Sequence, residues 1–74
     1  MQLIRLNQLH KDGTGVVWSF QGSEEVIVRL REMGIKEKTI ITMLSAEGNS
    51  YIIRVEKNRY LIGKGVAKVI TVVI

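Results

Sequence analysis

The sequence predicts a small β-barrel of five short strands with one short helix. Three observations support this. The apolar residues are mostly aliphatic and β-branched, with only four aromatic side chains in the chain. Clusters of glycine and polar residues divide the sequence into short segments. A single segment repeats apolar residues at helical spacing. The fold class is therefore all-β with one helical addition.

Length and composition limit the classes of protein that fit. The 74 residues make one domain, 1–74, and a chain of this size buries only about 60% of its unfolded surface. The absence of cysteine excludes disulfides, thiolate metal sites and thiol nucleophiles, and favours a reducing compartment. No apolar run approaches the roughly 18 residues of a membrane span, and the start lacks a signal-peptide layout. We expect a soluble protein of the cytoplasm.

The first strand is expected over Val16–Phe20, a segment rich in β-branched and aromatic residues. One turn at Leu6–Leu9 and a glycine-containing turn at Lys11–Gly15 precede it. Trp18 and Phe20 are two residues apart, so we expect them to share a strand face and pack under the helix. The alternative is a partly exposed aromatic anchor for a partner.

The helix is expected from about Ser23 to Met33. Ser23 suits the N-cap position, and two glutamates follow it in the first turn, where the helix dipole favours negative charge. Gly34 fits the residue with positive φ that ends helices, and Ile35 would return to the core. The apolar stripe comprises Val26, Ile27, Leu30 and Met33.

The second half of the chain predicts four more strands, at Thr39–Leu44, Tyr51–Glu56, Tyr60–Ile62 and Ile70–Val73. A loop at Ala46–Ser50 and a tight turn at Lys57–Arg59 separate the middle three, and Gly63–Lys68 is short enough for a single tight turn. We expect a closed or nearly closed barrel without exposed edges. The residues expected to be largely buried are Leu30, Met33, Ile41, Met43, Ile53, Val55, Ile62, Ala67 and Ile70.

Catalytic and metal-binding patterns are missing from the sequence. His10 is the only histidine, and Asp12 is the only oxygen ligand near it in sequence. The adjacent Glu24 and Glu25 do not face each other on a helix, so they do not form an acid–base pair. We therefore predict no catalytic residue, no cofactor and no tight metal site.

The charge pattern is only weakly informative. The formal net charge is +4, and nine of the eleven basic residues lie from Arg29 onward, interspersed with acidic ones. This pattern is typical of a solvated surface, and it also fits an acidic partner, a nucleic acid or a membrane face. Tyr51 and Tyr60 are too few for a clear platform on which bases could stack.

Two blocks of the sequence resemble the FeoA family, the small accessory proteins of bacterial ferrous iron transport, and the resemblance covers essentially the whole chain. The first block is the segment Leu30–Ile35, which reads Leu-Arg-Glu-Met-Gly-Ile. The second is Ile62–Ile70, which reads Ile-Gly-Lys-Gly-Val-Ala-Lys-Val-Ile. The family often carries proline-glycine in its turns, whereas this chain has no proline and places Lys11–Asp12 and Glu37–Lys38 there.

The resemblance implies an SH3-like barrel and a cytoplasmic, non-catalytic role beside the FeoB permease, whose cytoplasmic region carries a GTP-binding domain. It also implies that the chain reaches the membrane only through this partner. A similar module forms the C-terminal domain of DtxR-type repressors, which links the family to transition metals. We predict that the permease is bound by exposed residues around the end of the helix: Arg29, Arg31, Gly34, Lys36 and Lys38.

Two other functions stay open. A small basic barrel could bind nucleic acid, although we expect none, and the chain could be a metal-responsive module. Weak self-association is also kept open. Binding measurements with nucleic acid at different salt concentrations, and titration with a divalent metal, distinguish these alternatives.

Overall fold

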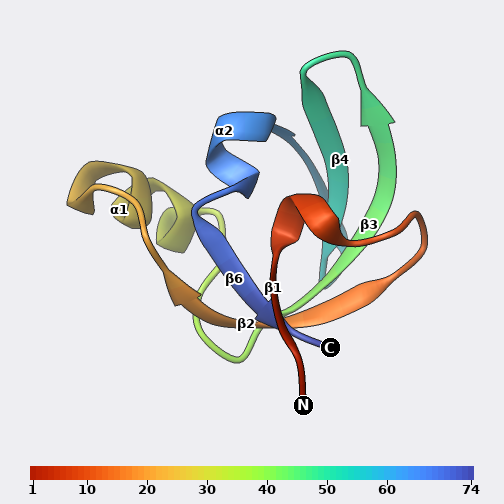
Figure 1. The fold of residues 1–74 in the computed structure, drawn as a ribbon. Coiled ribbons are helices and arrows are strands. Elements are labelled where there is room, and N and C mark those ends of the chain that lie inside the picture. Colours follow the sequence, from red (N-terminus) through yellow and green to blue (C-terminus); the bar gives the residue numbers. More distant parts are fainter.

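The structure is a computed structural model that describes residues 1–74. It forms one antiparallel sheet of six strands with two short helices (Figure 1). The strands lie in the order β1-β6-β2-β3-β4-β5. In chain order the elements are β1 Leu3–Arg5, the 3₁₀ turn η1 Leu6–Gln8, β2 Thr14–Phe20, α1 Glu24–Glu32, β3 Ile40–Glu47, β4 Ser50–Val55, β5 Asn58–Gly63, α2 Lys64–Ala67 and β6 Ile70–Val73.

The predicted fold class, mostly β with one short helix, is confirmed, but the sheet has six strands where five were predicted, and it is not closed. The additional strand, β1, has only three residues and pairs with β6 near the other end of the chain. Such a short segment carries no clear alternation, so its pairing depends on contacts that are remote in sequence. Strands β1 and β5 do not pair with each other, and each leaves one edge of the sheet open.

The other strands lie where the sequence predicted them, although most are longer than expected. Strand β2 begins at Thr14 because Thr14 pairs with Thr42 of β3. Strand β5 begins at Asn58, directly after a turn in which Glu56 has a φ of +57°. The predicted turn at Lys57–Arg59 therefore lies slightly too late. The segment after β5 forms the single helical turn α2.

Helix α1 has the predicted caps. The Ser23 hydroxyl accepts a hydrogen bond from the backbone N–H of Val26 at 3.3 Å. At the other end, Gly34 has a φ of +86°, and its N–H donates to the carbonyl of Arg31 at 2.9 Å. The N–H of Ile35 donates to the carbonyl of Leu30, also at 2.9 Å. These two bonds form a Schellman motif, and they direct Ile35 into the core, where it is fully buried.

The core lies between the inner face of the sheet, Leu30 of α1, and the turns η1 and α2. All residues predicted to be buried are buried except Met33, which is half-buried because it is the C-cap of α1. Leu6, Val17 and Val72 are core residues that the prediction omitted. The twelve core residues are Leu6, Val17, Leu30, Ile35, Ile41, Met43, Ile53, Val55, Ile62, Ala67, Ile70 and Val72.

A bulge in β2 separates the two aromatic side chains that were predicted to share a face. Val17 pairs with Val72 and Ser19 pairs with Thr71, so Trp18 is an extra residue between two ladder positions. Phe20 consequently packs against the core, whereas Trp18 is 52% exposed. The expectation that Trp18 packs under the helix was wrong.

Candidate docking site

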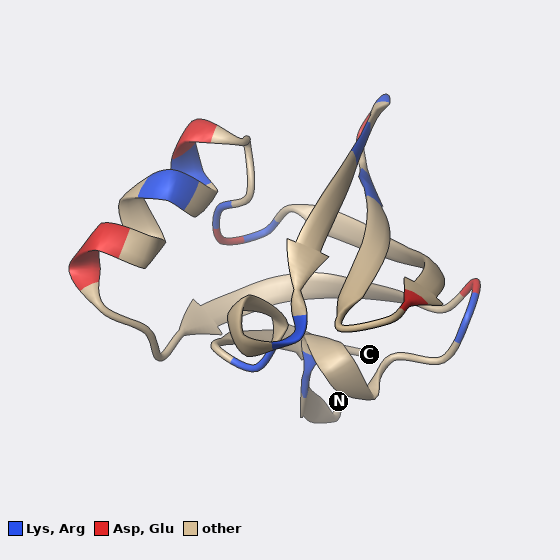
Figure 2. Cartoon of the chain, turned by 90° about the horizontal axis from the view of Figure 1, so that it is seen from above, with Lys and Arg blue, Asp and Glu red and all other residues tan.

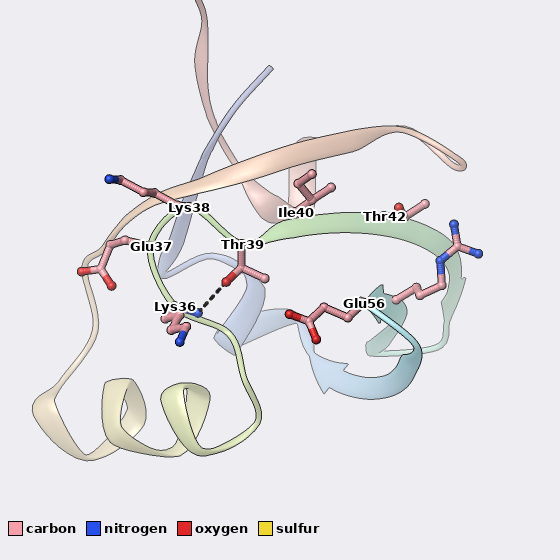
Figure 3. Close-up of a pocket in the computed structure, with 8 residues that line it drawn as sticks. Lys36, Glu37, Lys38, Thr39, Ile40, Thr42 and Glu56 are labelled. Carbon is pink, nitrogen blue, oxygen red and sulfur yellow. Dashed lines mark hydrogen bonds between the residues drawn. The ribbon is translucent and has the colours of Figure 1, made fainter.

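A polar groove lies beside the connection between α1 and β3. Its volume is about 550 Å³ (Figure 3). The connection supplies one wall, and outward-facing residues of β3 and β4, together with the turn after β4, supply the remainder. The lining residues are Lys36, Glu37, Lys38, Thr39, Ile40, Thr42, Arg54 and Glu56.

Backbone hydrogen bonds fix the connection against β2. The N–H of Lys38 donates to the carbonyl of Val17, and the N–H of Val17 donates to the carbonyl of Thr39, both at 2.8 Å. Lys38 has a φ of +75°, which turns the chain sharply into β3. The Thr39 hydroxyl lies 3.4 Å from both the carbonyl of Gly34 and the N–H of Lys36. The wall of the groove is therefore held by the sheet and by its own turn.

Arg31 ties α1 to this connection. Its guanidinium forms two contacts of 3.0 Å with the two carboxylate oxygens of Glu37 and lies over the ring of Phe20, 5.6 Å from the centroid. A hydrogen bond from its own backbone N–H, followed by the contact with Arg31, lowers the pKa of the Glu37 carboxyl. Arg31 thus links α1 to the connection and to β2. A count of basic residues in the sequence could not reveal this role.

Arg29 lies outside the groove. It forms an exposed pair with Glu25 at 3.8 Å, one turn earlier on α1, where Figure 2 shows acidic residues at the start of the helix and basic residues further along. Arg29 also lines a separate, mainly apolar cleft of about 230 Å³. That cleft lies between α1, β5 and α2, and it is lined by Val26, Arg29, Leu30, Met33, Leu61, Ile62, Gly63 and Val66.

The five predicted site residues therefore occupy three kinds of position. Lys36 and Lys38 line the groove, and Gly34 shapes the turn that leads to it. Arg29 and Arg31 do not line the groove and instead pair with Glu25 and Glu37, respectively. The prediction missed Arg54 and Glu56 of the groove. The sequence signal for them was their outward position in the predicted strand, but their approach to the connection depends on the pairing of β3 with β4.

The groove has mixed charge and no arrangement typical of an active site. Three basic and two acidic side chains line it. His10 is exposed, and no group of three histidine, cysteine, aspartate or glutamate residues is close enough to hold a metal ion. Neither helix is long and apolar enough to cross a membrane. The absence of a tight metal site remains a prediction for titration to test.

A six-stranded antiparallel sheet with one capped helix and an open polar groove defines a small domain of the SH3-like class. The particular family follows from the sequence: the model of the FeoA domain matches residues 4–74, and the chain belongs to this family. No curated protein sequence matches the chain closely enough to count as a relative.

Solved structures agree with this assignment. An iron uptake regulatory protein, FeoA, is 26% identical with a TM-score of 0.88, and the match covers 96% of each chain. FeoA of Stenotrophomonas maltophilia complexed with zinc, described as a prokaryotic SH3 domain protein, is 24% identical with a TM-score of 0.82, over 93% of this chain and 88% of that one. A manganese-dependent transcriptional repressor complexed with manganese is 16% identical with a TM-score of 0.90. This chain spans only 37% of that repressor, and the likeness shows the shared fold alone.

Proposed function

We propose that this chain is a non-catalytic accessory module of bacterial ferrous iron transport that binds the cytoplasmic region of an FeoB-type permease. Membership of the FeoA family and the SH3-like fold support a role in ferrous iron transport. The Stenotrophomonas protein of the same fold has been suggested as an activating factor of ferrous iron transport. A role in binding a partner is consistent with the side chains of this domain. Its only histidine, His10, is exposed, and it belongs to no group of three residues that could hold a metal ion.

We place the binding surface for the partner at the polar groove. Its wall is rigid, because the Schellman motif, the Arg31–Glu37 pair and two hydrogen bonds to β2 hold the connection in place. A preformed surface loses little conformational entropy on binding. Lys36 and Lys38 are exposed and form no ion pair, so both can contact acidic groups of a partner and accelerate association.

The test measures association of the full chain with the purified cytoplasmic region of the permease at several salt concentrations. The Lys36→Glu/Lys38→Glu variant should associate about tenfold or more slowly, with a weaker dependence on salt, while its melting temperature stays near that of the parent. Arg31 is left unchanged because its loss would disturb the connection itself.

The matched control is Lys11→Glu/Lys68→Glu, which changes the net charge equally at exposed positions outside the groove. If both double variants slow association to the same extent, net charge and not the groove governs encounter. Absence of binding by the parent chain would contradict the proposed partner. Strongly salt-dependent binding to generic RNA or DNA in the same experiment would favour the nucleic-acid alternative instead.

A further inference from the structure

The outer face of the sheet carries a continuous row of apolar side chains. Leu3 pairs with Val73, Val73 pairs with Val16, and Val16 pairs with Ile40, so one row crosses four neighbouring strands on a single face. Leu3 is 47%, Val16 38% and Ile40 60% exposed, whereas Val73 is half-buried. We call these four residues the outer row. The exposed Trp18 adjoins the row, two residues beyond Val16 on the same strand.

The fold does not require the outer row to be apolar. The core residues of the same strands point to the opposite face, as Val17 and Val72 show by their complete or nearly complete burial. The outward pairs on either side of the row are polar: Thr14 with Thr42 on one side, and Ser19 with Thr71 on the other. A contiguous apolar patch with a polar border is typical of a surface that binds another protein.

The border of the outer row is also basic. Arg5 lies beyond Leu3, Lys38 precedes Ile40, and Arg54 pairs with Thr42 on the opposite side of the row. All three are exposed. The two salt bridges of the molecule are Arg29–Glu25 and Arg31–Glu37, so none of these three cations has an acidic partner. Arg5 instead donates to the backbone carbonyl of Lys68 at 2.6 Å.

We propose that the outer row binds an apolar protein surface with an acidic border, which, on the function proposed above, belongs to the cytoplasmic region of the permease. Ile40 and Lys38 also line the polar groove, so the groove and the outer row form one continuous surface. The partner would then cover the sheet from the connection across to β1.

Two other occupants fit the geometry less well. A second copy of this chain would bring basic borders together, because both sides of the row carry cations, and like charges disfavour that packing. An anionic membrane would attract the cations, but the threonine and serine side chains beside the row share its face and would enter the bilayer with it. An apolar surface of limited width, bordered by carboxylates, matches both features.

Trp18 provides a direct probe, because it is the only tryptophan in the chain. The full chain labelled with 5-fluorotryptophan should give a single ¹⁹F signal, which should shift when the cytoplasmic region of the permease is added. The Val16→Thr/Ile40→Thr variant keeps β-branched side chains on the strands but removes apolar surface, and it should raise the Kd about tenfold or more. Val28→Thr, at a 48% exposed position on α1, is the matched control and should bind like the parent.

The possible failures are distinguishable. If the parent binds, the Trp18 signal does not move and the double variant binds equally well, the outer row is not the interface, while the proposed function stands. If the parent does not bind at all, both proposals fail. A shift of the Trp18 signal with phosphatidylglycerol vesicles but not with the permease region would overturn this proposal in favour of a lipid surface. Self-association that the double variant abolishes would overturn it in favour of a second copy.

Discussion

Helix α1 and the sheet are attached to the molecule in different ways. The sheet is held by paired strands and by eleven of the twelve core residues, which lie on strands, on the turns η1 and α2, or at Ile35. Helix α1 lies to one side of the sheet (Figures 1 and 2), and only Leu30 of its nine residues is buried. The half-buried Val26 in its first turn and Met33 at its C-cap also pack against the core, and the Schellman motif and the Arg31–Glu37 pair hold its C-terminal end. The connection that forms the groove wall is thus bonded to β2, whereas helix α1 itself depends on one buried residue and a few contacts at the margin of the core.

The largest expected effect is that of Leu30→Ala. Leu30 is the single buried anchor of α1, so the truncation should lower the free energy of unfolding by about 2–5 kcal/mol. In a domain this small, the loss could unfold the whole chain. Thermal melting measures it, and amide exchange shows whether α1 detaches before the sheet opens. A variant that melts like the parent would show that α1 is not anchored by Leu30.

Gly15→Ala tests the sheet, and we expect a smaller loss of about 1–3 kcal/mol. A Cβ at this position would lie 2.7 Å from Cγ2 of Val72, a fully buried side chain that has no room to move. Denaturant unfolding measures the effect. Gly63→Ala is the control, since a Cβ there would meet no atom within 4 Å. Equal losses in the two variants would contradict the close approach of β2 and β6.

Gly34→Ala tests the end of α1, with an expected loss of about 1–2 kcal/mol. A Cβ at Gly34 would meet nothing within 4 Å, so the cost comes only from the φ of +86°. Gly34→Asn should lose less, because asparagine tolerates this conformation better. If the Gly34→Ala variant and the parent unfold at the same denaturant concentration, the Schellman motif does not hold the connection.

The smallest expected effect concerns Arg31 and Glu37. The folded state lowers the pKa of Glu37 below the ordinary value of 4.5, so the stabilisation is complete above that value and disappears as the pH falls through the folded pKa. An NMR titration of the Glu37 carboxyl carbon should show the lowered midpoint. Arg31→Gln should raise it only in part, because the backbone hydrogen bond of Glu37 is the larger cause. A titration midpoint of 4.5 for Glu37 in the parent would contradict both the backbone hydrogen bond and the contact with Arg31.

The features that the sequence predicted well are those set by local chemistry. Ser23 and Gly34 mark the two ends of α1, because a helix start needs a hydroxyl cap and a helix end needs a residue with positive φ, and both are local requirements. Strand β6 was predicted at its observed bounds from a run of β-branched residues. Strand β1 and the bulge at Trp18 escaped prediction because they depend on pairing between the two ends of the chain.

The candidate site was predictable only in part for the same reason. Lys36 and Lys38 follow the helix in sequence, so their place in the connection was evident. Arg31 has the same charge and a similar position, but the structure commits it to Glu37 and Phe20. Arg54 joins the groove through pairing with β3, and the outer row arises from the registers of four strands.

We propose that a partner docks on the connection after α1 and on the adjoining sheet face. Backbone amide shifts of the ¹⁵N-labelled chain, followed during titration with the cytoplasmic region of the permease, test it most directly. We expect the largest changes in residues 36–42, at Arg54 and Glu56, and along the outer row. Changes confined to the cleft between α1, β5 and α2, or no changes at all, would contradict it.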